Sequence, residues 1–163
     1  MNTVALLIGG NQGDRRQLIQ QTTESIQQCI GSVVASSSVH ETEPWGDFGA
    51  EQVRPFFNQA LLVETSLEAH DVLREALSIE AQMGRKRADT LPGQPRVYHS
   101  RPMDIDIIFF NDEVISTPEL VVPHPRMHQR LFVLAPLAEI IPHYRHPLLN
   151  KTVLELLQDN ENN

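Results

Sequence analysis

The pattern of hydrophobic and polar residues predicts a chain that alternates between strands and helices. An apolar run at residues 4–8 predicts a short first strand, which ends at Gly9-Gly10-Asn11 in a tight turn. Further strands are predicted where apolar or β-branched residues alternate with other residues, at 32–39, 56–65 and 101–110. Helical spacing of apolar residues predicts helices at 14–30, 66–83, 126–137 and 152–158.

The ends of these elements carry their own signals. Ser66 is the predicted N-cap of the second helix, and Gly31 and Gly84 are the predicted stops of the first two helices. Cys29 falls on the apolar stripe of the first helix, which predicts a packing role. Residues 109–115 predict a hairpin, and the prolines that follow keep residues 121–125 extended. The resulting order of elements is βαββαβ.

Two aspartates in the 101–110 strand form the central chemical feature of the chain. Side chains alternate along a strand, so Asp104 and Asp106 lie on one face while Ile105 and Ile107 lie on the other. Hard cations prefer oxygen ligands, and carboxylates about 6–7 Å apart leave room for magnesium ions between them. The alternative is an edge strand with two solvated acids, or acids neutralised by nearby arginines.

Length and composition predict one globular domain over residues 1–158, followed by a frayed polar tail at 159–163. No basic region precedes the first apolar run, so neither a secretory signal nor a membrane segment is expected. One cysteine excludes an intramolecular disulfide and suits a reducing compartment, which makes the cytoplasm the expected location. A net charge of −8 argues against a duplex nucleic acid as partner.

The positive charges are unevenly distributed. Eleven of the thirteen cationic residues are arginines, and five of the thirteen fall within seventeen residues: Arg85, Lys86, Arg87, Arg96 and Arg101. The guanidinium fork matches phosphate oxygens bidentately, so this segment, just before the aspartate pair, predicts binding of a small polyanion. The Pro- and Gly-containing stretch 88–100 has the character of a lid, and the alternative is a solvated basic loop.

Five other residues, of which Phe56 and Asn58 are considered together, each admit two interpretations. Phe56 and Asn58 share a face at the start of their strand, where they either stack on and hydrogen-bond a flat heterocycle or close a loop against the core. Trp45, in the long loop 40–55, either caps a ligand or folds onto the core. Glu80, on the apolar stripe of its helix, is either a salt-bridged structural acid or an acceptor for ligand hydroxyls. His124 lies between two prolines and is more often structural than catalytic in such a setting.

Seven short blocks follow one another along nearly the whole chain. They are Ile8-Gly9-Gly10-Asn11, Thr42-Glu43-Pro44-Trp45-Gly46, Phe56-Phe57-Asn58, Ile79-Glu80 with Gly84-Arg85-Lys86-Arg87, Arg101-Pro102-Met103-Asp104-Ile105-Asp106, Val122-Pro123-His124-Pro125, and Arg130-Leu131-Phe132-Val133-Leu134-Ala135-Pro136-Leu137. In this order they resemble the 6-hydroxymethyl-7,8-dihydropterin pyrophosphokinase family, which transfers pyrophosphate from ATP to a pterin alcohol. The resemblance implies a ferredoxin-like α+β sandwich, a mostly antiparallel sheet with helices packed on it, which is compatible with the βαββαβ order.

The resemblance also implies a role for each matched position. Asp104 and Asp106 are expected to hold two magnesium ions on the phosphates of ATP, with Arg85 and Arg101 as further catalytic residues. The expected ATP contacts are Glu80, Arg85, Arg87, Ile107, His124 and Arg130. The expected pterin contacts are Thr42, Pro44, Trp45, Phe56, Asn58 and Phe132, with the pterin ring between the two phenylalanines. No obligate protein partner is implied.

Two other functions remain open from the residues alone. One is a different two-metal enzyme on a ferredoxin-like sheet, such as a nucleotidyl transferase or a cyclase. The other is a binding module that holds a pterin or a nucleotide without turnover. The second follows from departures from the family pattern: Tyr98 stands where a tryptophan is common, His99-Ser100 precede Arg101, and Glu43 replaces a common proline.

Overall fold

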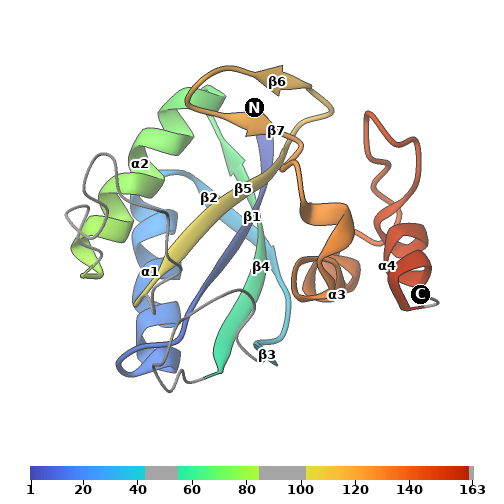
Figure 1. Cartoon of the computed structure of the whole chain (residues 1–163). Helices are drawn as coiled ribbons and strands as arrows, with labels where there is room; N and C mark the ends of the chain where they lie inside the picture. Colours follow the sequence, from blue (N-terminus) through green and yellow to red (C-terminus); the bar gives the residue numbers. More distant parts are fainter. Residues whose placement is uncertain (43–54, 85–101, 162–163) are drawn as a thin grey trace, which may run out of the picture.

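The computed structural model of the chain describes residues 1–42, 55–84 and 102–161. A five-stranded antiparallel sheet forms its centre (Figure 1), with β1 (Asn2–Gly10) between β4 (Phe56–Thr65) and β5 (Asp104–Phe110). On its other side β4 pairs with β2 (Ser32–Ser36) and β3 (His40–Thr42). This strand order is that of a ferredoxin-like sandwich, so the predicted α+β fold is confirmed.

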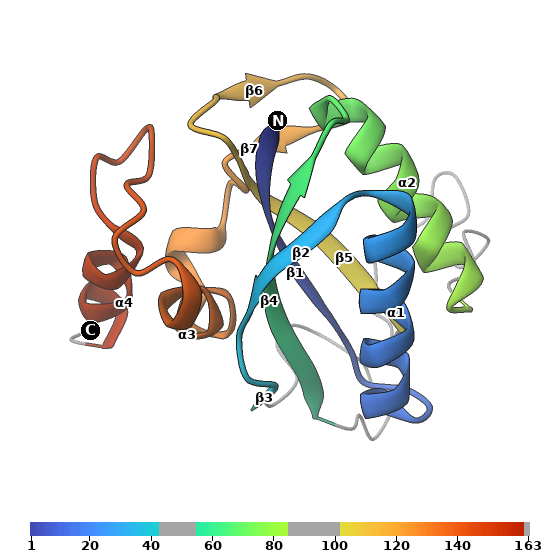
Figure 2. The ribbon, with the colours of Figure 1, turned by 180° about the vertical axis from the view of Figure 1, so that it is seen from behind.

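Helices pack on both faces of the sheet (Figure 2). α1 (Arg15–Cys29) and α2 (Ala69–Gln82) lie on one face, and α3 (Leu131–Ile140) lies on the other with α4 (Val153–Glu161) beside it. Each face has its own hydrophobic core because side chains alternate along β1. Leu6 and Ile8 are buried beneath α1 and α2, whereas Ala5 and Leu7 are buried beneath α3. We call these two sides the α1/α2 face and the α3 face.

Gly9 and Gly10 continue β1 instead of forming the predicted tight turn. A β-carbon on Gly9 would clash with the Phe57 carbonyl oxygen and with Oδ1 of Asn58. Glycine at this position therefore serves a close approach between β1 and β4, and it makes room for the Asn58 side chain.

The first helix begins and ends close to its predicted limits. Oδ1 of Asp14 accepts a hydrogen bond from the backbone N–H of Gln17 (3.2 Å) and caps the N-terminus. The buried stripe follows Ile19, Thr22, Ile26 and Ile30. Cys29 is exposed, so its predicted packing role is wrong: the stripe passes to one side of it.

The second helix starts later than predicted, at Ala69, with Glu68 instead of Ser66 at the N-cap. Oγ1 of Thr65 donates to the carbonyl oxygen of Ile30 (2.6 Å) and accepts from the N–H of Leu67 (3.0 Å). These bonds tie the chain to the end of α1 before the helix begins. Gly84, at φ 102°, provides the predicted stop.

The strand that follows β5 does not form the predicted hairpin with it. Asn111 turns the chain at φ 50°, but its N–H donates to the carbonyl oxygen of Thr3 (2.7 Å) and its Oδ1 accepts from the N–H of Thr3 (2.8 Å). The chain is thereby bound to β1, and β6 (Ile115–Ser116) pairs with β7 (Val121–Val122) in a separate small sheet.

The helix predicted at 126–137 is two elements. A 3-10 turn covers Met127–Gln129, Arg130 is extended at φ −123° and ψ 106°, and α3 begins at Leu131. On one continuous helix Met127 and Val133 would lie about 120° apart. The break lets both side chains reach the core of the α3 face.

The last helix is longer than predicted and includes residues 159–161 of the expected tail. A reciprocal pair of hydrogen bonds starts it: Glu155 N donates to Oγ1 of Thr152 (3.1 Å), and Thr152 N donates to Oε1 of Glu155 (3.1 Å). Among the described residues, none of the helices has both the length and the apolar character needed to cross a membrane.

Candidate active site

The aspartate pair and Asn58 lie on the same face of the sheet. In the register, Asn58 on β4 and Asp104 on β5 are both opposite Gly9 of β1, and Asp106 is opposite Leu7. Directly paired residues share a face, and Leu7 is buried in the core beneath α3. The two acids and the amide therefore point to the α3 face, on three adjacent strands.

The predicted alternation along β5 is confirmed. Asp104 and Asp106 are half-buried, whereas Ile105 and Ile107 are buried in the core of the α1/α2 face. β5 is the edge of the described sheet, as the alternative interpretation of the two acids expected. The side chain of Ile107 points away from the aspartates, so any contact of Ile107 with a nucleotide beside them comes from its backbone. That contact stays a prediction.

Glu80 is a buried acid that holds the aspartate-bearing strand. Its side chain is 3% exposed, and its Oε2 accepts a hydrogen bond from the N–H of Ile105 (2.7 Å). On the edge strand this N–H points away from β1 and needs a partner, because an unpaired buried amide is unfavourable. The described contact is thus a structural one, and the ATP contact of Glu80 stays a prediction.

Asn58 is held by its neighbour on β3. Its side chain is 6% exposed, and its Nδ2 donates to Oγ1 of Thr42 (2.9 Å). Thr42 is opposite Phe56 in the β3–β4 register, and alternation along β4 places Phe56 and Asn58 on one face. The structure therefore brings these three predicted pterin-binding residues together.

Phe132 comes to the same side from the first turn of α3, which packs against β4. It is half-buried, and the guanidinium carbon of Arg130 lies 5.5 Å from the centre of its ring. The extended backbone of Arg130 places both side chains at the start of the helix.

His124 is a half-buried neutral histidine beside two arginines. The backbone N–H of His124 donates to the carbonyl oxygen of Ile108 (3.0 Å), and the imidazole Nδ1 accepts from the backbone N–H of Arg126 (3.3 Å). Burial, and then the charges of Arg130 and Arg126, lower the pKa of His124 from 6.5 to about 4. The imidazole is therefore uncharged at neutral pH and can contact a ligand only as a neutral donor or acceptor.

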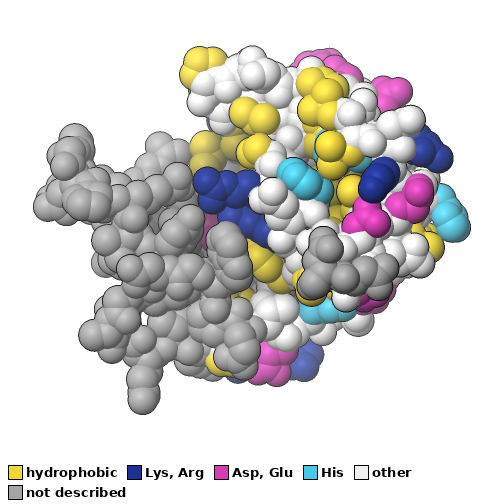
Figure 3. Space-filling model, turned by 45° about the vertical axis from the view of Figure 1, so that its right-hand side comes forward, with side chains coloured by type: hydrophobic (Ala, Val, Ile, Leu, Met, Phe, Trp, Pro, Cys, Tyr) yellow, Lys and Arg dark blue, Asp and Glu magenta, His cyan; other side chains and the backbone are white. Residues whose placement is uncertain are grey.

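Five of the predicted site residues lie outside the described residues: Pro44, Trp45, Arg85, Arg87 and Arg101. In the described part of the chain, basic side chains gather near the middle of the face that α3 and α4 present (Figure 3). The described residues contain no group of three or more acids, histidines or cysteines placed to hold a metal ion.

Arg15 is a basic residue that stabilises this region and that the sequence patterns do not predict as part of the site. Nη1 of Arg15, at the start of α1, donates to the carbonyl oxygen of Pro55 (2.8 Å), and its guanidinium carbon lies 4.1 Å from the ring centre of Phe57. Arg15 thereby fixes the start of β4 next to Phe56. Its partners are about forty residues away along the chain, so no local pattern indicates this contact.

The fold and the site together define an antiparallel α+β sandwich with two acids, an amide and an aromatic ring directed to one face. The sequence model of the family described as 7,8-dihydro-6-hydroxymethylpterin-pyrophosphokinase matches residues 5–142, and the chain belongs to that family. It is 38% identical over 148 residues to the 2-amino-4-hydroxy-6-hydroxymethyldihydropteridine pyrophosphokinase of Porphyromonas gingivalis, covering 90% of this chain and 95% of the relative. With the enzyme of the same name from Bacillus subtilis the identity is 40% over 142 residues, covering 86% and 79%.

Solved structures show the same fold. The crystal structure of Plasmodium falciparum HPPK-DHPS, wild type with pteroate, superposes with a TM-score of 0.74 at 18% sequence identity. The match covers 97% of this chain and 42% of that longer chain. At this identity the likeness supports the architecture alone.

Glu80→Ala is expected to lower the free energy of unfolding by about 2–3 kcal/mol, because it leaves the buried Ile105 N–H without its side-chain acceptor. Glu80→Gln keeps an acceptor oxygen and should lose less. Urea unfolding at pH 7 measures both, with Glu68→Ala, an exposed glutamate next to the same helix, as the control. Equal losses for the Glu80 and Glu68 variants would contradict the structural role of Glu80.

The lowered pKa of His124 predicts an acid-sensitive contribution to stability. The unfolded chain binds a proton at His124 near pH 6.5 and the folded chain only near pH 4, so this contribution is present above pH 6.5 and is lost as the pH falls toward 4. With allowance for partial exposure, the wild type should lose about 1 kcal/mol more than His124→Asn between pH 7 and pH 5. Chemical denaturation at both pH values tests this, with substitution of an exposed histidine, His143→Asn, as the control. An equal loss of unfolding free energy in the wild type and in His124→Asn would refute the prediction.

Proposed function

We propose that the chain transfers pyrophosphate from ATP to 6-hydroxymethyl-7,8-dihydropterin and releases AMP, a step of folate biosynthesis. The observation that carries the proposal is the family match over residues 5–142, a range that contains every predicted site residue. The arrangement of the described residues supports it, because the acids, the amide and the aromatic side chains meet on one face.

The proposed reaction is a displacement at phosphorus. The hydroxymethyl oxygen of the pterin forms a bond to the β-phosphorus of ATP, the bond from that phosphorus to the α–β bridging oxygen breaks, and AMP leaves with the electron pair. The hydroxyl proton passes to solvent. Such a transfer depends chiefly on aligning the two oxygens and on neutralising charge on the non-bridging oxygens. The main requirement on the protein is therefore to bind the two substrates in alignment with each other, and a strong base is less important.

The chemistry of Asp104 and Asp106 fits a magnesium requirement. Both side chains offer oxygen ligands, and both are half-buried on the α3 face. They are two residues apart on β5, whose orientation is fixed by the burial of Ile105 and Ile107. Magnesium ions bound there would neutralise charge on the phosphates of ATP. In this proposal Arg85, Arg87 and Arg101 add positive charge from the adjacent segment of the sequence, as guanidinium groups suit phosphate.

The pterin is proposed to bind at Thr42, Asn58, Phe56 and Phe132. An amide offers two N–H donors and one acceptor, and the bond from Asn58 to Thr42 uses one donor and fixes the orientation of the group. A fixed, largely buried amide can then discriminate the polar edge of a flat heterocycle, since a ligand lacking the matching groups leaves it unpaired. The aromatic side chains provide stacking surface for the ring.

The nucleotide is proposed to lie along β5 and the start of α3. His124 and Arg130 both belong to this end of the molecule, and the neutral imidazole suits an uncharged part of the nucleotide. Arg130 provides a charge that the phosphates can approach. The backbone of Ile107 on β5 and Glu80 on α2, which is bound to the N–H of Ile105, are the further proposed ATP contacts among the described residues.

An assay of products separates this function from its two rivals. Incubation of the protein with ATP, magnesium and 6-hydroxymethyl-7,8-dihydropterin should yield AMP only when the pterin is present. Release of pyrophosphate without pterin would favour a nucleotidyl transferase or cyclase. Binding of both ligands with no AMP formed would favour a binding module.

Asp104→Asn and Asp106→Asn are each expected to lower kcat by about 10²–10³-fold, because each removes a charged oxygen ligand while keeping the size of the side chain. Thermal unfolding should change little, since both side chains are half-buried and outside the hydrophobic cores. Asp112→Asn, an exposed acid in the turn after the same strand, is the matched control and should keep the wild-type rate. A near-normal rate in either site variant would refute the metal assignment.

A further inference from the structure

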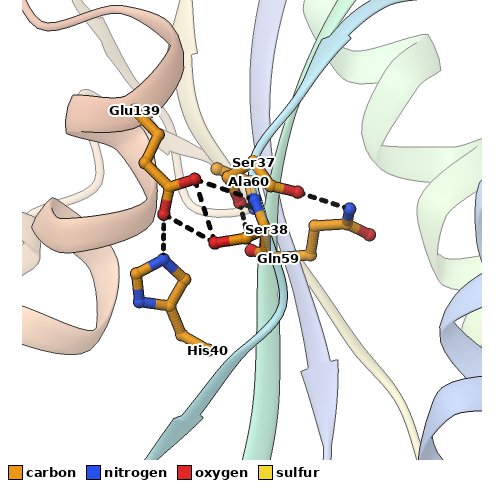
Figure 4. Close-up of polar contacts among 6 residues, drawn as sticks. All are labelled: Ser37, Ser38, His40, Gln59, Ala60 and Glu139. Carbon is orange, nitrogen blue, oxygen red and sulfur yellow. Dashed lines mark hydrogen bonds and ion pairs between the residues drawn. The ribbon is translucent and has the colours of Figure 1, made fainter.

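A carboxylate on the second half of α3 binds the chain segment that leads into β3. Oε1 of Glu139 accepts a hydrogen bond from the backbone N–H of Ser38 (2.9 Å), and the hydroxyl of Ser38 lies 2.9 and 3.0 Å from its two oxygens. Nε2 of His40 contacts the other carboxylate oxygen (Figure 4). Three groups from one short segment thus converge on a single side chain of the helix.

The same segment is fastened to β4 on its other side. Ser37 N donates to the carbonyl oxygen of Ala60 (2.9 Å), and Oγ of Ser37 accepts from Ala60 N (2.9 Å). The side-chain amide of Gln59 also donates to the carbonyl oxygen of Ser37 (2.7 Å). The segment 37–40 therefore links β4 to α3, and Glu139 provides the helix half of the link.

Both partners of this link also carry residues of the proposed pterin site. On β3, His40 and Thr42 are two residues apart and share a face, and they lie opposite Asn58 and Phe56 of β4. On α3, Phe132 and Glu139 are seven residues apart, so they lie on nearly the same side of the helix. Strand β3 and helix α3 are therefore joined at His40 and Glu139. The same strand carries Thr42, and the same helix carries Phe132.

We propose that Glu139, together with Ser38 and His40, positions the two walls of the pterin site relative to each other. One wall is Thr42 with Asn58, and the other is Phe132. This inference rests on the proposed function. Stacking on the pterin ring and hydrogen bonding to its polar edge both require a defined distance between the walls. A displacement of about 1 Å is enough to disturb the alignment of a bound ligand substantially.

The charge on Glu139 supports this role. Hydrogen bonds from the Ser38 N–H, and then from His40 and the Ser38 hydroxyl, lower the pKa of Glu139, so it is ionised at neutral pH. His40 and Glu139 are 26% and 38% exposed, which makes the link weak as a contribution to global stability. Its expected effect is local, on the placement of β3 against α3.

The test compares pterin affinity with ATP affinity in Glu139→Ala, Glu139→Gln and Ser38→Ala. Glu139→Ala removes every contact and should weaken pterin binding about three- to tenfold, measured as Kd by ligand fluorescence and as KM for the pterin. Glu139→Gln keeps an acceptor for the Ser38 N–H and should lose less, and Ser38→Ala removes only the hydroxyl contacts. The KM for ATP should stay within about twofold in all three, as Glu139 is not among the proposed ATP contacts.

Glu155→Gln is the matched control, because Glu155, like Glu139, is an exposed glutamate on a helix whose side chain accepts a backbone N–H, in this case that of Thr152. It should leave the Kd for the pterin unchanged. A purely structural role for Glu139 predicts a lower Tm in Glu139→Ala with the wild-type Kd for the pterin, and that result would overturn the inference. If Glu139→Ala does not fold, unchanged pterin affinity in both Glu139→Gln and Ser38→Ala has the same meaning.

A double-mutant cycle with Thr42→Ala shows whether Glu139 acts through the wall. If it does, the loss of pterin affinity from Glu139→Ala should shrink once Thr42 is removed, whereas additive losses would overturn the inference. The proposed function fails separately: it fails if the wild type neither binds the pterin nor forms AMP from ATP. Normal wild-type activity with normal pterin affinity in the Glu139 variants refutes the inference alone.

Discussion

The burial of Ile105 and Ile107 beneath α1 and α2 is the constraint on which the site depends. Because side chains alternate along a strand, that burial places Asp104 and Asp106 on the opposite face. A slip of one residue in the pairing of β5 would put two carboxylates into a hydrophobic core and two isoleucines onto the α3 face. Glu80 adds a second restraint, because its bond to the Ile105 N–H attaches the free edge of β5 to α2.

The register of β1 extends this constraint across the sheet. Gly9 is opposite both Asn58 and Asp104, so one position on the central strand aligns the amide of β4 with the first acid of β5. A larger residue there would meet the Asn58 side chain, which is itself bound to Thr42. The same strand therefore places both Asn58, which is proposed to bind the pterin edge, and the proposed metal ligands. A movement of β1 would disturb both.

Local patterns predicted those features whose cause is local. β4 was predicted at its observed limits, and the common face of Asp104 and Asp106 followed from strand alternation. The patterns failed where distant partners decide the conformation. Asn111 binds Thr3 on β1, which diverts the predicted hairpin, and the extended Arg130 divides a predicted helix so that residues on both sides reach one core. The link of Glu139 to Ser38 spans 101 residues and has no signal in the sequence.

The sign of the charges explains why the proposed reaction needs both the acids and the arginines. The chain carries a net charge of −8, and its two site aspartates lie on the α3 face together with Asn58. Two like charges 4 Å apart repel by about 1 kcal/mol in water and by about 4 kcal/mol at the lower effective permittivity of a protein surface. Bare ATP would meet that repulsion at several phosphate oxygens. In the proposed function, magnesium held by the aspartates would offset this repulsion, so the site would favour the metal-bound nucleotide over bare ATP, and the arginines would neutralise charge that remains.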